Sequence, residues 1–517
     1  MGQLLTVAAG ADMNARQQAQ SVLETAETTQ TVEYINALVA LMINPQVEEG
    51  LRNLAGLQIK NALTGTSSKI AADKKQRWLG LDPNMRVQVK GALLRLLCDR
   101  SAQVARSAAI VIAKMGEIEL SVKQWPELCS QLHDHVTNST TQAGGDLQLA
   151  AQTRRFTLNS MGYLCEYLYD ANCDLEPDQM NKLLTAIIFC MDDKQSPVIR
   201  HAAMQALSES LPFATTNFAR ANERNVIMKK VCEASQMQGT DEDSVKTRRF
   251  AYVCMTIVAQ FYYGKCMVVV VSGIFLFFWI VYYFVVSYLM NNSRSSPFFL
   301  VFLCFLSSNN CNNLFNPLLF TNTEYLQDYV QVLFQLTVGA IKGDVEEVSH
   351  YAIEFWNTLC DTEVNIAYDV KQCENNGTQP EQPCKHFVRA AIKHLIPVVF
   401  EAMCKQSEDD EEGSLCVQAA CCMQLCGQLV GDDILQFVMP LVMNNIQHQD
   451  WHLREAATYS FGAIMDGCSV DKVGQYANQS LPTLVKMLGE EVHDKTRGTT
   501  VKVVVVAVVV VVVATRI

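Results

Sequence analysis

Three segments of the chain share one residue pattern, and their spacing limits the folds that the chain can adopt. They begin at Val104, Val198 and Val245, and each carries Arg and Ala within the next six residues. The first two starts lie 94 residues apart and the next two lie 47 apart, so the longer interval holds two of the shorter units. A chain that repeats a helical unit in this way stacks its units, because one unit cannot bury its apolar face alone.

A period near 47 residues is typical of HEAT repeats, in which each unit is a pair of packed helices. We therefore expect an all-α fold, a right-handed superhelical HEAT solenoid of the armadillo-like helical class. Segments 348–353 and 453–457 extend the series, and their starts lie 105 residues apart, which fits two units with longer loops. Solenoids of this kind bind other proteins along an extended surface.

One interval does not fit the period. Val245 and Val348 lie 103 residues apart, and removal of residues 265–321, 57 residues of different composition, reduces the interval to 46. Within that insert, 266–290 contains no charged residue and is long enough to cross a bilayer as a helix. Because the flanking residues complete one repeat without the insert, we interpret it as translated intervening sequence. A membrane-anchored adaptor is the alternative.

The C-terminal end is also unusual. Residues 503–513 are all Val except Ala507, a run that we expect to be a low-complexity tail prone to aggregation and too β-branched for a membrane helix. The predicted order is an N-terminal segment (1–14), a first module of repeats (15–100), further repeats (101–264), the insert (265–321), more repeats (322–500) with an acidic loop at 408–412, and the tail (501–517).

The composition argues against several function classes. A net charge of −12 disfavours direct nucleic-acid binding and suits basic protein partners. The 19 Cys lie mostly on apolar helical faces, as buried thiols do, and Cys373, Cys384 and His386 match no zinc spacing, so we expect no metal and no cofactor. The chain has no phosphate-binding Gly loop, nucleophile elbow or His-Glu-x-x-His motif, and we predict that it is not an enzyme.

Several motifs, in register along the chain, resemble the N-terminal half of importin-β (karyopherin-β). These are AGLQIKNALT at 55–64, QRWL at 76–79, QWPEL at 124–128, LTAII at 184–188, AIEFW at 352–356 and DWHLREAA at 450–457. The resemblance implies a nuclear transport receptor of the cytoplasm, nucleus and nuclear pore, which is unloaded by the Ran GTPase in its GTP form. Importin-β-like chains continue for about as many residues again, so binding of importin-α or basic cargo is expected to be weakened.

The resemblance also implies two binding sites. For Ran-GTP it points to Lys60, Glu354 and Asp361 and to the acidic run of Glu408, Asp409, Asp410, Glu411 and Glu412. For the Phe-Gly repeats of nucleoporins it points to Leu184, Thr185, Ile188, Glu223, Val226 and Ile227, with Val226 where the family commonly has Phe. Without the resemblance, these charges would be ordinary surface residues and the apolar set an interhelical core. A static HEAT scaffold, which needs no GTPase site, is the other alternative.

Overall fold

A computed structural model of the chain describes residues 1–517 except 193, 264–324, 381, 407–413, 492 and 515–517. The insert at 265–321, its candidate membrane span at 266–290 and the acidic run at 408–412 therefore lie outside the described residues. The chain divides into two compact units, 1–257 and 258–517. Where the structure describes the chain, its regular elements are helices, and no strand is present.

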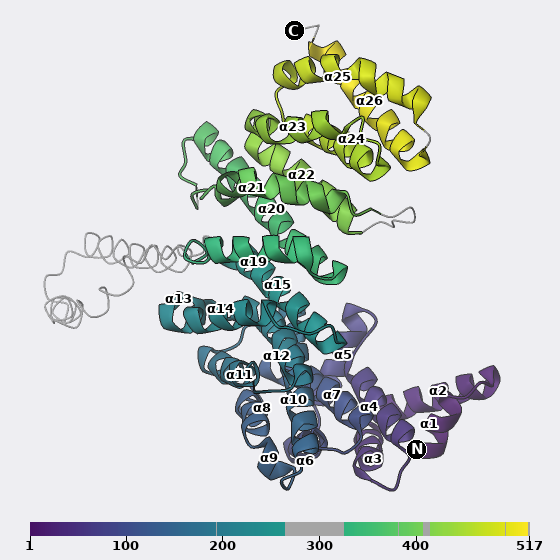
Figure 1. Cartoon of the computed structure of the whole chain (residues 1–517). Helices are drawn as coiled ribbons and strands as arrows, with labels where there is room; N and C mark the ends of the chain where they lie inside the picture. Colours follow the sequence, from purple (N-terminus) through teal and green to yellow (C-terminus); the bar gives the residue numbers. More distant parts are fainter. Residues whose placement is uncertain (193, 264–324, 381, 407–413, 492, 515–517) are drawn as a thin grey trace, which may run out of the picture. The chain divides into compact units, whose positions relative to one another are not determined.

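Unit 1 consists of helix pairs that pack in two layers (Figure 1). In one layer, which we call the A helices, α3 packs on α6 and α8 packs on α11; in the other, the B helices, α4, α7, α10 and α12 pack in series. The bounds are α1 Gly2–Ala8, α2 Met13–Thr29, α3 Thr31–Ile43, α4 Glu49–Leu63, α5 Ser68–Leu79, α6 Pro83–Leu96, α7 Ala102–Leu120, α8 Leu128–Thr137, α9 Ser139–Gln142, α10 Leu147–Asp170, α11 Pro177–Cys190, α12 Pro197–Ser210, η1 Leu211–Phe213, α13 Thr215–Ala219, α14 Ala221–Ser235 and α15 Glu242–Tyr262.

Unit 2 has the same arrangement. The A helices α19, α21 and α23 pack in series, as do the B helices α20, α22, α24 and α26, and each A helix packs on the B helix that follows it. Their bounds are α19 Val330–Gly343, α20 Glu346–Asn376, α21 Phe387–Met403, α22 Leu415–Val430, η2 Gly431–Ile434, α23 Leu435–Asn445, α24 Trp451–Met465, α25 Val470–Glu490 and α26 Asp494–Ala514.

The repeated segments that define the period all fall at the starts of B helices. Val104 lies in α7, Val198 in α12, Val245 in α15, Val348 in α20 and Leu453 in α24. The two long intervals each hold one further B helix, α10 in the first and α22 in the second. The HEAT architecture predicted from the spacing is therefore confirmed.

Local sequence explains where many helices begin. The Asp82 carboxylate accepts hydrogen bonds from the backbone N–H groups of Asn84 and Met85, and Pro83 occupies the first position of α6. Asp146 accepts from two backbone N–H groups at the start of α10, and Asp450 accepts from one, that of His452, at the start of α24. These side chains satisfy backbone donors that have no partner within the helix, so each polar loop ends in a defined helix start.

The B helices pack closely because small residues face the neighbouring helix. Ala105, Ala108 and Ala109 of α7 are fully buried. A Cβ atom at Gly56 of α4 would lie 2.7 Å from Ser107 Oγ of α7, so only glycine fits there. This close approach accounts for the paired alanines that recur in the repeated segments.

The Val-rich end of the chain forms part of α26, and the predicted boundary at 500 falls within this helix. Val503 and Ala507, one turn apart, are buried, whereas Val505, Val509 and Val512 are exposed. Among the described residues, two stretches are long and apolar enough to cross a membrane by length and composition alone, Leu415–Asn445 and Asp494–Ala514. The first of these consists of core elements of unit 2, namely α22, η2 and α23.

Candidate functional site

The residues predicted to bind Phe-Gly repeats lie on two helices of unit 1, the A helix α11 and α14, which is the next A helix by its place in the chain before α15. Leu184 and Ile227 are buried, with 5% and 3% exposed, whereas Val226 is 50% exposed. Thr185 is exposed and Ile188 is half-buried. The set therefore divides into buried aliphatic side chains and exposed ones that an external side chain could contact.

A short intervening helix joins α11 to α14 through one buried amide. Asn217 of α13 is 4% exposed, and its Nδ2 donates to Asn181 Oδ1 of α11 at 2.6 Å and to Glu223 Oε2 of α14 at 2.7 Å. Arg220 Nη1 donates to the other Glu223 oxygen at 2.9 Å. Partial burial acts to raise the pKa of Glu223, but the hydrogen bonds from Arg220 and Asn217 outweigh it and lower the pKa, so this carboxylate is ionised at neutral pH.

The described residues predicted to bind Ran-GTP all lie on B helices. Lys60 is half-buried in the last turn of α4, in unit 1. Glu354 and Asp361 lie seven residues apart on α20, in unit 2, and so share one face of that helix. Burial raises the pKa of the Cys421 thiol of α22, and the charges of Glu354 and Asp361 raise it further, which places both carboxylates near this exposed cysteine.

Comparisons with known proteins agree with this layout. Residues 438–468 match the HEAT repeat family. Importin subunit beta-1 of Arabidopsis thaliana is 31% identical over 504 residues, 96% of this chain and 49% of that protein. The Schizosaccharomyces pombe protein of the same name is 29% identical over 95% of this chain and 48% of its own length. The chain is homologous to importin subunit beta-1. It spans about half the length of these relatives.

Solved structures of importin-β match as well. Yeast importin-β (Kap95p) superposes with a TM-score of 0.75 and 26% identity over 96% of this chain and 49% of that chain. Kap95 in a complex with Nup1 gives a TM-score of 0.73 at 25% identity, over 96% of this chain and 49% of that chain. Kap95p in a complex with RanGDP gives a TM-score of 0.74 at 25% identity, also over 96% of this chain and 49% of that chain. The importin-β resemblance predicted from the motifs is thereby confirmed.

The importin-β motifs did not predict an acidic cluster on the B helices of unit 1. Partial burial raises the pKa of Glu209 in α12, and the charges of Glu166 and Asp170 in α10 raise it further. Burial and Asp170 likewise raise the pKa of Glu166. Within the described part of the chain these carboxylates have no cationic partner, so the cluster keeps its negative charge available to an external one.

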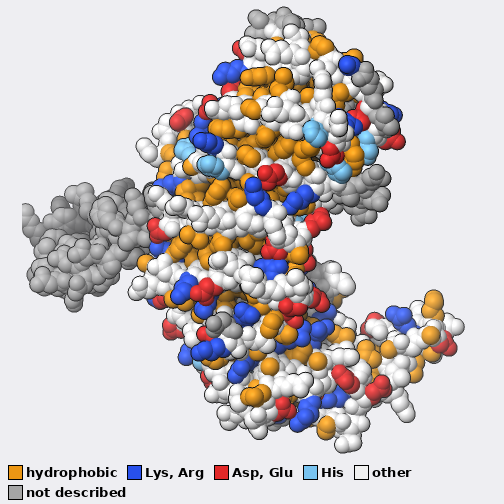
Figure 2. Space-filling view, in the orientation of Figure 1, with side chains coloured by type: hydrophobic (Ala, Val, Ile, Leu, Met, Phe, Trp, Pro, Cys, Tyr) orange, Lys and Arg blue, Asp and Glu red, His pale blue; other side chains and the backbone are white. Residues whose placement is uncertain are grey.

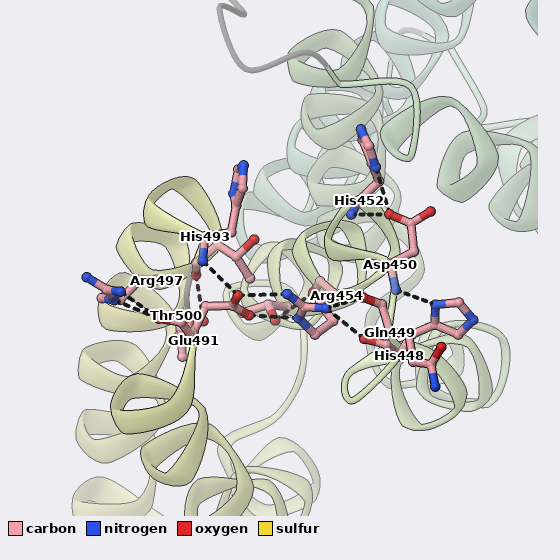
Figure 3. Close-up of polar contacts among 11 residues, drawn as sticks. His448, Gln449, Asp450, His452, Arg454, Glu491, His493, Arg497 and Thr500 are labelled. Carbon is pink, nitrogen blue, oxygen red and sulfur yellow. Dashed lines mark hydrogen bonds and ion pairs between the residues drawn. The ribbon is translucent and has the colours of Figure 1, made fainter.

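The importin-β-like motif at 450–457 contains an arginine that joins two repeats (Figure 3). Arg454 of α24 donates from Nε and Nη2 to the two carboxylate oxygens of Glu491, both at 2.7 Å, and from Nη1 to the carbonyls of His448 and Gln449, both at 2.8 Å. Arg497 donates to the Glu491 carbonyl at 2.6 Å. Arg454 thus connects its own A–B loop to the A–B loop of the next repeat.

The same device occurs in unit 1. Arg52 is the fourth residue of α4, as Arg454 is of α24. Its Nε donates to the Met42 carbonyl at 2.7 Å, and its Nη1 donates at 3.2 Å to Asp99, in the A–B loop of the next repeat. We call this arrangement the arginine staple. Sequence reasoning identified the motif around Arg454 but not the staple, because each partner carboxylate lies in another repeat.

Charges of both signs are interspersed over the face drawn in Figure 2, with apolar side chains between them. No group of three or more His, Cys, Asp or Glu among the described residues lies close enough together to hold a metal ion.

Proposed function

We propose that this chain is a nuclear import receptor that binds Ran-GTP and the Phe-Gly repeats of nucleoporins. The observation that supports the proposal best is the extent of the homology, which runs over 96% of the chain and through both units. Its homologues are transport receptors rather than enzymes. The solved Kap95 complexes contain RanGDP in one case and Nup1 in another.

For Ran-GTP, the proposed contacts are Lys60 on α4 and Glu354 and Asp361 on α20. Lys60 has no ion-pair partner in the part of the chain that the structure describes, so its ammonium group is available to an acidic surface. The acidic run 408–412 belongs to the same proposal and would attract a basic patch over a long range, an effect that weakens as salt rises. Ran-GTP and cargo would then compete for the receptor.

For nucleoporins, the proposed contact is the surface of α11 and α14. A Phe side chain would lie on Ile188 and Val226, above the buried Leu184 and Ile227, while the fixed amide and carboxylate of Asn217 and Glu223 bound one side. The Val226 side chain offers a bound Phe less contact area than the Phe that the family commonly has at this position. The contact with a single Phe-Gly repeat is therefore weak. Weak contacts suit a receptor that must release each repeat quickly, because many repeats restore the overall affinity.

For cargo, the cluster of Glu166, Asp170 and Glu209 would favour basic segments, including an importin-α arm, on the B helices of unit 1. Carboxylates that lie close together without cations between them attract a basic partner more strongly than a neutral one. Residence in the cytoplasm and nucleus, with passage through the pore, follows from the proposed activity.

The test is capture of Ran by the full chain, with Ran loaded with GTP in one arm and GDP in the other. We expect preferential capture of the GTP form and a loss of capture in Glu354→Lys and Asp361→Lys. Glu374→Lys is the matched control, because it reverses an exposed charge on the same helix, α20, outside the proposed contact. Equal capture of both forms, or none by a folded sample, would leave a static scaffold as the function.

A further inference from the structure

One B helix carries the staple arginine without a staple. Arg200 is the fourth residue of α12, the position that Arg52 holds in α4 and Arg454 in α24. Within the described residues, the Arg200 side chain makes no hydrogen bond or ion pair, and its Nε is buried without an acceptor. Arg86, Arg154 and Arg224 also have a buried Nε without an acceptor, but each uses another guanidinium nitrogen in a hydrogen bond.

The neighbouring repeat explains why Arg200 is unpaired. Three residues before the next B helix, the loops that hold Asp99 and Glu491 carry a carboxylate, whereas the loop between α14 and α15 has Gly239. Met237 of the same loop lines a cavity together with Arg200. The nearby Asp243 carboxylate instead accepts a hydrogen bond from the His201 imidazole, with Nδ1 and Oδ1 2.9 Å apart. Arg200 therefore lines this cavity without pairing with a carboxylate of the neighbouring loop.

This cavity has a volume of about 340 Å³, within the range of ligand-binding pockets. Met191, Met204 and Met237 are each buried and form its apolar part. Its charged part consists of Arg200, Lys230 and Glu233, and Glu233 Oε2 lies 3.0 Å from Lys230 Nζ. Two cations and one carboxylate leave the cavity with one net positive charge, in a chain whose net charge is −12.

We propose that this cavity binds the C-terminal residue of a peptide with an apolar side chain. The terminal carboxylate would take the place beside Arg200 that Asp99 and Glu491 take in the arginine staples, since guanidinium and carboxylate pair through two parallel hydrogen bonds. The apolar side chain would lie on the three methionines, whose flexible thioethers adapt to different shapes. A phosphate group fits less well, because its two negative charges would lie in one cavity with the Glu233 carboxylate and against methionines, which offer no donor.

The test is a titration of the full chain, labelled with ¹³C in the methionine methyl groups, with N-acetyl-leucine. We expect saturable shifts of the Met191, Met204 and Met237 methyl resonances, and much smaller shifts with N-acetyl-leucinamide, which lacks the charge. Arg200→Gln should weaken binding by about tenfold or more, because hydrogen bonds to charged groups contribute about 1.5–3 kcal/mol. Arg100→Gln, at a side chain that is 84% exposed, is the matched control.

A second variant keeps Arg200 and fills the cavity instead. Ala234→Leu adds volume at a half-buried lining residue, and it should abolish the shifts while the methyl spectrum elsewhere stays unchanged. Equal shifts with the acid and the amide would overturn the proposal. So would a carboxylate response that persists in both Arg200→Gln and Ala234→Leu, since no part of the proposed site would then be needed.

Discussion

Replacement of Arg454 by Met gives the sharpest test of how repeats are joined. The Arg454 side chain is 19% exposed and that of Glu491 is 3% exposed, so the variant removes two charge-assisted hydrogen bonds from a nearly buried carboxylate, which keeps one from the His493 backbone N–H. Breaking such a pair costs about 3–5 kcal/mol. The carbonyls of His448 and Gln449, which also lose a hydrogen bond from Arg454, belong to exposed residues and can bind water instead. Their loss therefore adds little to the free-energy cost. We therefore expect the packing of α24 on α26 to lose about 3 kcal/mol or more of free energy.

Hydrogen exchange measures this loss locally. Because each repeat contacts only its neighbours, amides of α25 and α26 should exchange on the order of a hundredfold faster in Arg454→Met, while those of α4 stay unchanged. Adding Glu491→Gln should restore most of the protection of these amides, because the nearly buried side chain at 491 then carries no charge that needs Arg454.

Arg200→Met is the matched control, at the same helix position but without a partner, and it should change exchange in unit 1 by less than about threefold. If Arg454→Met exchanged like the unmodified chain, or if Arg200→Met lost as much protection as Arg454→Met, the staple would have no energetic role and the reasoning would be refuted.

Three further predictions follow from individual residues. Glu209→Gln should raise the melting temperature at pH 7, because burial and nearby acids raise the pKa of Glu209, so that its charge destabilises the folded state. The gain should shrink as pH falls and disappear below the ordinary pKa of 4.5, where the carboxyl is protonated in both states. Val226→Phe should tighten binding of a Phe-Gly peptide by about threefold to tenfold in a fluorescence titration, and unchanged affinity would contradict the proposed groove. Gly56→Val should lower the free energy of unfolding in urea by about 1–3 kcal/mol, because Ser107 and Met42 already occupy the space of a side chain.

The spacing of the repeated segments predicted the B helices well, for a physical reason. Each B helix must present small residues to its neighbours, so Ala108 in α7 and Ala202 in α12 recur at the period of the stack. The motif 184–188 likewise placed Leu184 and Ile188 on one helix. Both features depend on residues that are close together in the chain, so the sequence alone predicts them.

Contacts between repeats were not predicted. Asn217 bridges α11 and α14 from a helix of only five residues, too short to show a pattern. Glu209 meets Glu166 only after α10 and α12 have packed. The valines of α26 are poor helix formers by intrinsic preference, and the helix is stabilised by burial of Val503 and Ala507. The run at 408–412 and the insert lie outside the described residues, and their roles stay predictions.

The staples differ in kind along the chain, and this makes its joints unequal in stiffness. Arg52 and Arg454 join neighbouring repeats through ionised pairs, which resist separation strongly. At the α12 to α15 joint the link is His201 with Asp243, and burial lowers the pKa of His201, so that this imidazole is neutral at pH 7. A bending load on unit 1 would therefore deform this joint more than the joint that Arg52 and Asp99 hold, and a carboxylate bound beside Arg200 would stiffen it.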